Sequence, residues 1–186
     1  MAEFSIYSIE TAPEGSKAIL EGATQKYGFT PNLLGVLAES PAALKAYTSL
    51  AGAVAETTLS PTEQQVVVMT TSFENGCTYC MAAHSTISAM SGVADDVVES
   101  LRSGTDIADP KLNALAVFTR ATVRNNGLVD SSVTDAFLAA GYTNENILEV
   151  ITGIAQKVMS NYANHFAHTQ PDPQFAPKAW AKPAMA

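Results

Sequence analysis

The sequence predicts an all-α protein, on two observations. Residues that commonly cap helices stand directly before a proline at Thr30-Pro31, Ser40-Pro41, Ser60-Pro61 and Asp109-Pro110. A cap oxygen satisfies a free N–H at the helix start, and the proline gives up an N–H that has no partner there. Apolar residues follow these starts at three- and four-residue spacing, and no segment alternates as a strand would.

Each pair of start and stop signals defines one expected helix. Glycines that readily adopt the left-handed conformation close several of them, Gly28 and Gly76 among them. Ser60 and Glu63 form a predicted capping box before an apolar helix. The expected helices cover residues 13–27, 31–37, 41–54, 61–75, 77–90, 97–101, 110–125, 130–138 and 143–162.

The composition changes near the C-terminal end of the chain. Residues 1–169 are expected to form one helical domain, whereas residues 170–186 contain four prolines and are expected to form an extended tail. Trp180, the only tryptophan, has two readings: it anchors this tail on a neighbouring surface, or it belongs to a disordered end.

Composition and charge exclude several classes of function. Only 15% of the residues are charged, against about 25% in typical soluble domains, so we expect apolar surface to be buried in a homo-oligomer. The formal net charge is −8 and no Lys/Arg run exists, which excludes binding to the phosphate backbone of a nucleic acid. The chain shows neither a secretory signal nor an apolar run long enough to span a membrane, so a cytoplasmic location is expected.

The segment from Asn75 to His84 carries the chemistry that the sequence predicts. It contains both cysteines, Cys77 and Cys80, and His84 follows Cys80 by four residues, on the same face of a helix. Cys77 stands at a predicted helix start, whose positive dipole end lowers thiol pKa values, and His84 is expected to take the proton of Cys80. We expect Cys80 to attack a hydroperoxide and Cys77 to resolve the sulfenic acid as a disulfide.

Two non-redox readings of these residues stay open. Two buried cysteines on a helix are also ordinary core residues. Cys77, Cys80 and His84 with His165 or His168 would offer four zinc ligands, but compact zinc sites usually provide two closely spaced ligand pairs. We rank both below redox chemistry and expect no metal or cofactor.

The same segment resembles the AhpD-like alkylhydroperoxidase branch of the carboxymuconolactone decarboxylase superfamily. The matching residues are 59–63, the apolar helix after them, and the Cys-x-x-Cys-x-x-x-His run from Cys77 to His84. The resemblance implies an all-α AhpD-like fold, assembly into trimers or hexamers, and thiol-dependent reduction of alkyl hydroperoxides in antioxidant defence. It also implies Cys80 as the attacking thiol, Cys77 as the resolving thiol and His84 as part of a proton relay.

Two departures from the family pattern concern that relay. Gln65 stands where the relay glutamate is expected, and an amide cannot accept a proton at neutral pH. Tyr79 stands where some members have a histidine, and its phenol either donates a hydrogen bond or packs. Glu74 is a minor candidate for the missing carboxylate.

The sequence therefore predicts an alkylhydroperoxidase-like oxidoreductase that needs a hydroperoxide and an external thiol or disulfide-reductase partner. The alternatives are a disulfide oxidoreductase without peroxidase activity, a decarboxylase of the carboxymuconolactone type, and a non-catalytic helical oligomer. The decarboxylase ranks lower because it leaves the cysteine pair without a role.

Overall fold

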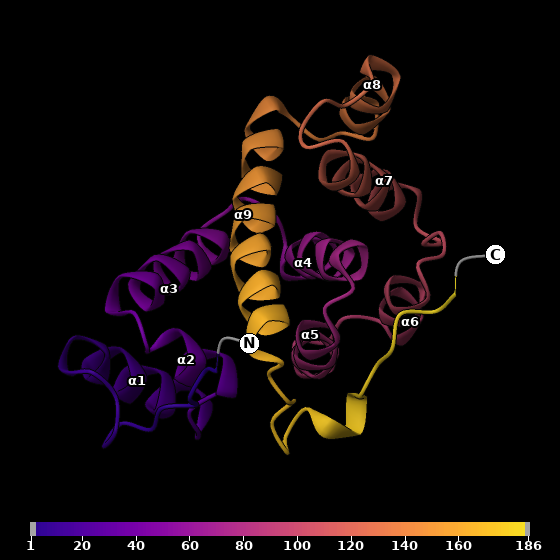
Figure 1. Cartoon of the computed structure of the whole chain (residues 1–186). Coiled ribbons are helices and arrows are strands. Elements are labelled where there is room, and N and C mark those ends of the chain that lie inside the picture. The colour runs from indigo at the N-terminus through magenta and orange to yellow at the C-terminus, as the bar shows by residue number, and fades with distance from the viewer. Residues whose placement is uncertain (1–2, 185–186) are drawn as a thin grey trace.

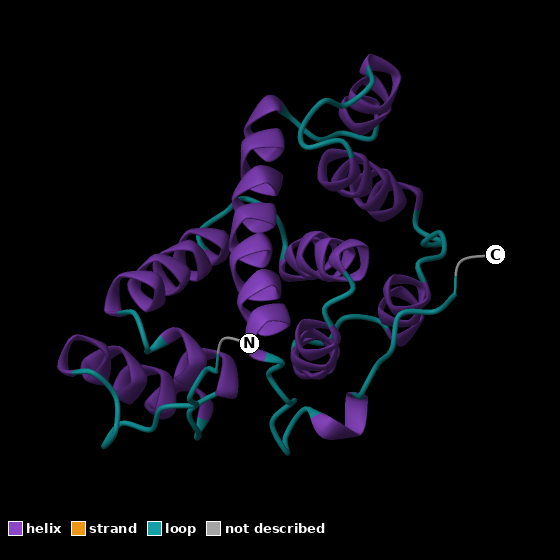
Figure 2. Cartoon of the chain, in the orientation of Figure 1, coloured by secondary structure: helices purple, strands orange, loops and turns teal. Residues whose placement is uncertain are grey.

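A computed structural model describes residues 3–184, and this part of the chain is all-α (Figures 1 and 2). The fold class predicted from the capping and periodicity signals is therefore confirmed. The helices are α1 (Glu14–Tyr27), α2 (Asn32–Leu37), α3 (Pro41–Ala55), α4 (Pro61–Asn75), α5 (Thr78–Met90), α6 (Asp95–Ser103), α7 (Pro110–Arg124), α8 (Ser131–Ala139), α9 (Asn144–Ala167) and the 3-10 turn η1 (Ala176–Lys178).

The predicted caps form at three of the four proline dipeptides. Ser40, Ser60 and Asp109 accept hydrogen bonds from the first turns of α3, α4 and α7. The fourth prediction is wrong, because Pro31 rather than Thr30 occupies the cap position of α2. The Thr30 hydroxyl instead bonds the hydroxyl of Thr24 at 2.6 Å, which ties the connecting loop to α1.

Helix α9 runs through the middle of the molecule, with α1 to α3 on one side and α4 to α8 on the other (Figure 1). Gly153 allows α4 to approach closely, since a Cβ there would lie 2.7 Å from Cγ1 of Val67. One apolar cluster lies under α4, α6 and α7, and a second joins α1, α2 and the start of α5. Because α9 borders both clusters, its inner face reaches the thiols.

The link between α4 and α5 fixes where the cysteines stand. Gly76 ends α4 with a φ of +68°, a conformation that side chains other than glycine adopt at a cost. The chain then turns directly into α5, and the Cys77 N–H bonds the Ser72 carbonyl at 2.9 Å. At the other end of α4, Ser60 and Glu63 complete the predicted capping box.

The C-terminal segment runs past α5 and along α6 (Figure 1). Trp180 anchors it: its indole N–H donates to the Arg102 carbonyl at 2.8 Å, and its ring packs 5.8 Å from that of Phe73. The Arg102 guanidinium donates in turn to the carbonyls of Lys178 and Ala179. Residues 173–178 of this segment form a turn that includes η1.

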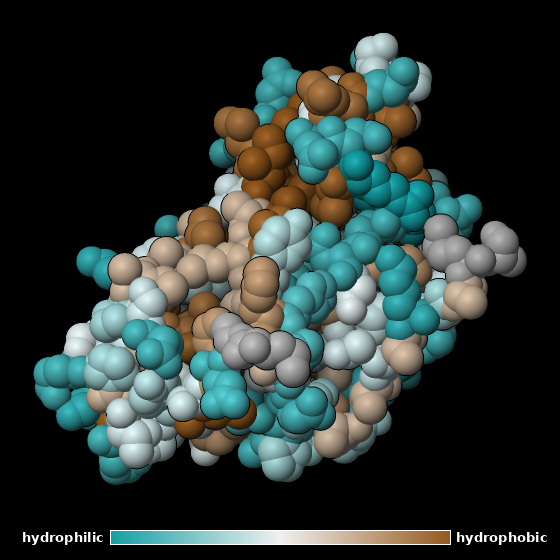
Figure 3. Space-filling model, in the orientation of Figure 1, coloured by the Kyte–Doolittle hydropathy of each residue, from teal (hydrophilic) through white to brown (hydrophobic). Residues whose placement is uncertain are grey.

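Apolar side chains gather on the surface where α9 begins beside α7 and α8 (Figure 3). Along α9 itself, the exposed large apolar residues are Leu148, Ile151, Tyr162 and Phe166. Exposed apolar stripes of this kind favour contacts between protein chains. The homo-oligomer stays a prediction. None of the described helices combines the length and the hydropathy needed to cross a membrane.

Candidate redox site

The two cysteines are reduced and lie at the first turn of α5. Cys77 is the N-cap residue, and its sulfur accepts a 3.4 Å hydrogen bond from the Cys80 N–H, as a serine cap would. Both residues are 1% exposed. The pair predicted from the Cys-x-x-Cys spacing is therefore close together.

Helix α9 supplies polar donors to both sulfurs. The Asn164 side-chain amide donates to Cys80 Sγ at 3.4 Å and to Cys77 Sγ at 3.8 Å. The Ser160 hydroxyl lies 3.7 Å from Cys80 Sγ. Donors aimed at sulfur favour the thiolate over the thiol.

These surroundings place the negative charge on Cys80. A hydrogen bond from the Cys77 thiol, the charge of Lys157 and the Ser160 hydroxyl together outweigh burial and lower the pKa of Cys80 to about 5. The pKa of Cys77 is raised, because its proton is shared with the neighbouring thiolate and because it is buried. The lowered pKa of Cys80 and the raised pKa of Cys77 favour a proton on Cys77 over one on Cys80.

His84 is fixed between two side chains from other helices. Its Nδ1 lies 3.0 Å from Oε1 of Gln65 on α4, and its Nε2 lies 2.8 Å from Nζ of Lys157 on α9. The ammonium donates to Nε2, so Nδ1 carries the ring proton and donates to Gln65. Burial and the charge of Lys157 lower the pKa of His84 well below its ordinary value.

This arrangement corrects one expectation from the sequence. His84 was expected to take the proton of Cys80 directly, from one turn away. Both of its ring nitrogens are instead engaged by Gln65 and Lys157, and the described residues contain no hydrogen bond from His84 to Cys80. His84 belongs to the site, but it is a neutral ring beside a buried cation.

Tyr79 links the motif to the C-terminal segment. Its hydroxyl donates to the Asp172 carboxylate at 2.6 Å, and Asp172 also accepts the Asn32 N–H at 2.9 Å. The Leu33 N–H points at the same phenol oxygen at 3.3 Å. Of the two readings of Tyr79, the hydrogen-bonding one holds, and it ties α2, α5 and the tail together.

Glu74 is not brought to the thiols. Its carboxylate is paired with Arg120 at 3.1 Å and with Arg124 at 2.7 Å, both on α7. Its side chain is only 6% exposed, so these two guanidiniums compensate a buried charge that joins α4 to α7. The suggestion that Glu74 replaces the relay carboxylate is thus contradicted by its contacts.

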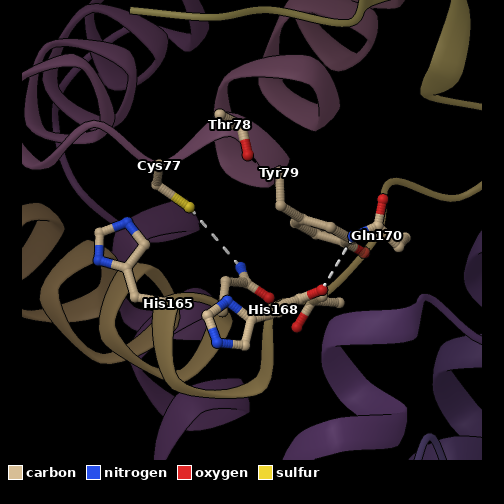
Figure 4. Close-up of a pocket in the computed structure, with 8 residues that line it drawn as sticks. Cys77, Thr78, Tyr79, His165, His168 and Gln170 are labelled. Carbon is tan, nitrogen blue, oxygen red and sulfur yellow. Dashed lines mark hydrogen bonds between the residues drawn. The ribbon is translucent and has the colours of Figure 1, made fainter.

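An open pocket of about 290 Å³ leads to Cys77 (Figure 4). Two of its oxygens, Asn164 Oδ1 and Thr169 Oγ1, are buried and have no hydrogen-bond partner within residues 3–184. Such atoms call for a polar partner. The pocket is lined by Cys77, Thr78, Tyr79, Asn164, His165, His168, Thr169 and Gln170.

The pocket also bears on the zinc reading. His165 and His168 line the same opening as Cys77 (Figure 4), whereas His84 lies with Lys157 and Gln65. Among the described residues, no three His, Cys, Asp or Glu side chains are grouped as metal ligands. The two thiols and their hydrogen-bond partners therefore make up the site.

Sequence reasoning missed the contribution of α9. Its inner face carries a polar stripe at three- and four-residue spacing, namely Lys157, Ser160, Asn161 and Asn164, each 4% exposed or less. The spacing was visible, but a polar stripe on an amphipathic helix ordinarily faces water. Only the packing of α9 against α4 and α5 shows that this stripe faces the thiols.

Comparison with known proteins agrees with this geometry. The model of the carboxymuconolactone decarboxylase family matches residues 41–121. The match includes the Cys-x-x-Cys segment and His84, and it ends before α9. The resemblance predicted from that segment is confirmed. No curated protein matches the chain.

Solved structures share the whole fold. A protein from Ralstonia eutropha JMP134, described as an alkylhydroperoxidase AhpD core and an uncharacterized peroxidase-related protein, superposes with a TM-score of 0.81 at 21% identity, covering 94% of this chain and 96% of that one. An uncharacterized peroxidase-related protein from Silicibacter sp. TM1040 gives 0.79 at 18% identity, covering 94% and 95%. The debrominase Bmp8, a cysteine-to-alanine variant in complex with 2,3,4-tribromopyrrole, gives 0.80 at 19% identity, covering 96% of each chain. The fold of the domain and its flanking helices is thus AhpD-like.

Proposed function

We propose that the protein is a thiol-dependent peroxidase that reduces alkyl hydroperoxides, with Cys80 as the attacking and Cys77 as the resolving thiol. The observation that carries the proposal is the environment of the Cys80 sulfur, which accepts a hydrogen bond from the Asn164 amide, lies 3.7 Å from the Ser160 hydroxyl and has a second thiol beside it. A stabilised thiolate next to a thiol suits the two steps by which cysteines reduce a peroxide.

The chemistry balances with the groups present. The Cys80 thiolate attacks the outer oxygen of a hydroperoxide, the O–O bond breaks, and Cys80 becomes a sulfenic acid while an alkoxide leaves and is protonated to the alcohol. The Cys77 sulfur then attacks the sulfenic sulfur, the S–O bond breaks, and water leaves. The cysteine pair loses two electrons and the hydroperoxide gains them.

The pocket opens at Cys77, the member of the thiol pair that lines it. Asn164 connects the pocket with the thiols, because its amide nitrogen bonds the sulfurs while its oxygen is free to accept the O–H of a bound hydroperoxide. A hydroperoxide bound to the Asn164 oxygen would lie next to the two sulfurs, and this proximity lowers the barrier to attack by the thiolate. Turnover then requires an external thiol, two equivalents per disulfide, to reduce the pair again.

Peroxide turnover with cysteine variants tests the proposal. The wild-type protein is expected to consume cumene hydroperoxide when dithiothreitol is supplied, and Cys80→Ser is expected to abolish this. Cys77→Ser should still react once, leaving a sulfenic acid on Cys80 that a dimedone adduct reports by mass spectrometry. Undiminished turnover by Cys80→Ser would overturn the proposal.

Reductive debromination is the second candidate. It is favoured by the similarity of fold to a debrominase solved with a brominated pyrrole, together with a pocket that opens at a thiol. The same assay with 2,3,4-tribromopyrrole in place of the hydroperoxide separates the two. Release of bromide by a protein that leaves hydroperoxides unreduced would replace the peroxidase proposal.

A further inference from the structure

Lys157 is a buried cation that the proposed thiol chemistry has not yet used. Its side chain is 1% exposed, on the inner face of α9. Its Nζ donates to His84 Nε2 at 2.8 Å, and no carboxylate pairs with it among residues 3–184. A buried ammonium without a counter-ion costs several kcal/mol, so it needs an anion nearby or loses its proton.

The titratable groups that act electrostatically on Lys157 come from three helices. They are Tyr27 on α1, Tyr47 on α3, and Cys77, Cys80 and His84 on α5 or at its cap. Burial raises the pKa of Tyr47 above its ordinary value, so this phenol stays neutral at physiological pH. His84 is neutral and Cys77 keeps its proton, which leaves the Cys80 thiolate as the anion for Lys157.

We infer that Lys157 is the counter-cation of the Cys80 thiolate and that it gives up its proton each time Cys77 and Cys80 close into a disulfide. The inference deepens the proposed function, on whose thiol pair it rests. In the reduced protein the two opposite charges stabilise each other inside the fold. Disulfide formation removes the negative charge, and the ammonium is then left uncompensated where the fold cannot solvate it.

The proton balance of peroxide reduction fits this assignment. Reduction of a hydroperoxide to an alcohol and water takes up two electrons and two protons. The Cys77 thiol and the Lys157 ammonium supply one proton each, and the products are the disulfide, a neutral lysine, the alcohol and water. Charge is conserved inside the site, because a thiolate and an ammonium disappear together.

This also accounts for Gln65. The Lys157 ammonium faces one ring nitrogen of His84, and the Gln65 amide oxygen accepts a hydrogen bond from Nδ1–H on the other side of the ring. Because the amide is uncharged, it does not favour a protonated ring. The lysine therefore supplies the proton that a relay carboxylate would otherwise handle. Lys157 acts on the sulfur through its charge and is a positioning residue.

The protons taken up on reduction of the disulfide provide the test. The disulfide is equilibrated with dithiothreitol between about pH 6.5 and 7.5, where thiols with pKa values near 8.5 are mainly protonated and the reagent exchanges two protons per two electrons. If Lys157 is protonated only while Cys80 is a thiolate, the protein also exchanges two protons per two electrons. The equilibrium constant then does not change with pH. If only Cys77 exchanges a proton, the constant changes about tenfold per pH unit.

Ultraviolet absorbance is measured in the same buffers to show that Cys80 is a thiolate. A thiolate together with a constant equilibrium supports the inference. A thiolate together with a tenfold change per pH unit overturns it and leaves the peroxidase proposal intact. A pair that forms no disulfide at all overturns the proposed function as well as the inference.

A single substitution tests the contribution of the Lys157 charge. Lys157→Met keeps the length of the side chain and removes its charge, and we expect the thiolate absorbance at neutral pH to be lost and Cys80 alkylation to slow at least tenfold. The exposed Lys45→Met is the matched control and should behave as wild type. Unchanged absorbance in a folded Lys157→Met protein would overturn the inference.

Discussion

The Tyr79 hydroxyl donates a 2.6 Å hydrogen bond to Asp172, and this contact joins the redox motif to a segment more than ninety residues further along the chain. Asp172 is only 2% exposed and also accepts the Asn32 N–H. Phe175 packs edge-on against the Tyr79 ring, with 6.1 Å between ring centroids. The tail thus packs over Tyr79, one of the two residues between the cysteines.

Removal of that hydroxyl should destabilise the protein. In Tyr79→Phe the buried carboxylate loses one donor, and leaving such a group unsatisfied costs about 1–3 kcal/mol in the free energy of unfolding. Urea denaturation measures the loss. Tyr162→Phe, on an exposed tyrosine of α9, is the control and is expected to change stability little. Equal stability of Tyr79→Phe and wild type would contradict the role assigned to the contact.

Stability of the reduced protein should depend on pH through Cys80. The pKa of Cys80 is about 5 in the folded protein and 9.0 in the unfolded chain. Between these values the unfolded chain binds more protons, so stability rises with pH, by up to about 1.4 kcal/mol per unit. The contribution is complete above the unfolded pKa and is lost as pH falls through the folded one.

Urea denaturation at several pH values under reducing conditions checks this dependence. Cys80→Ser lacks the titrating thiol, so the rise assigned to Cys80 should disappear in that variant. A slope in Cys80→Ser as steep as in wild type would assign the dependence to other groups.

Gln65→Glu should change the charge of the histidine. A carboxylate facing Nδ1 favours the imidazolium, so the pKa of His84 is expected to rise, and NMR titration of the ring measures it. Because Lys157 already supplies the proton, the rate of hydroperoxide reduction is not expected to rise. Gln64→Glu, one residue earlier on the same helix, is the control. A higher rate in Gln65→Glu would show that the amide limits turnover.

Gly104 is predicted to tolerate no side chain. Its φ of +71° favours glycine, and a Cβ there would clash with the Phe73 ring. Gly104→Ala should cost about 1 kcal/mol for the backbone and a further 1–3 kcal/mol for overpacking. Gly127→Ala has a similar φ of +84° but open space around it, so it should show the backbone cost alone in thermal or urea denaturation. Equal losses in the two variants would argue against the packing role.

The sequence by itself determined the helices and the position of the thiols. Prolines, caps and glycines act locally, over one turn of chain, and they placed Ser60, Gly76 and Cys77 where the structure has them. The Cys-x-x-Cys spacing fixed the pair for the same reason, since both residues belong to one turn of α5. The family resemblance followed from this continuous stretch.

Only the tertiary structure decided which groups surround the thiols. Lys157 and Asn164 lie on a helix about eighty residues away in sequence, and nothing local distinguishes their polar stripe from one that faces water. Packing of α9 between the two apolar clusters turns that stripe inward. It also places the lysine on His84, so that the histidine expected to be a base is a neutral ring beside a buried cation. The cysteine pair is thus a local product of the sequence, whereas the charge that balances it depends on long-range packing.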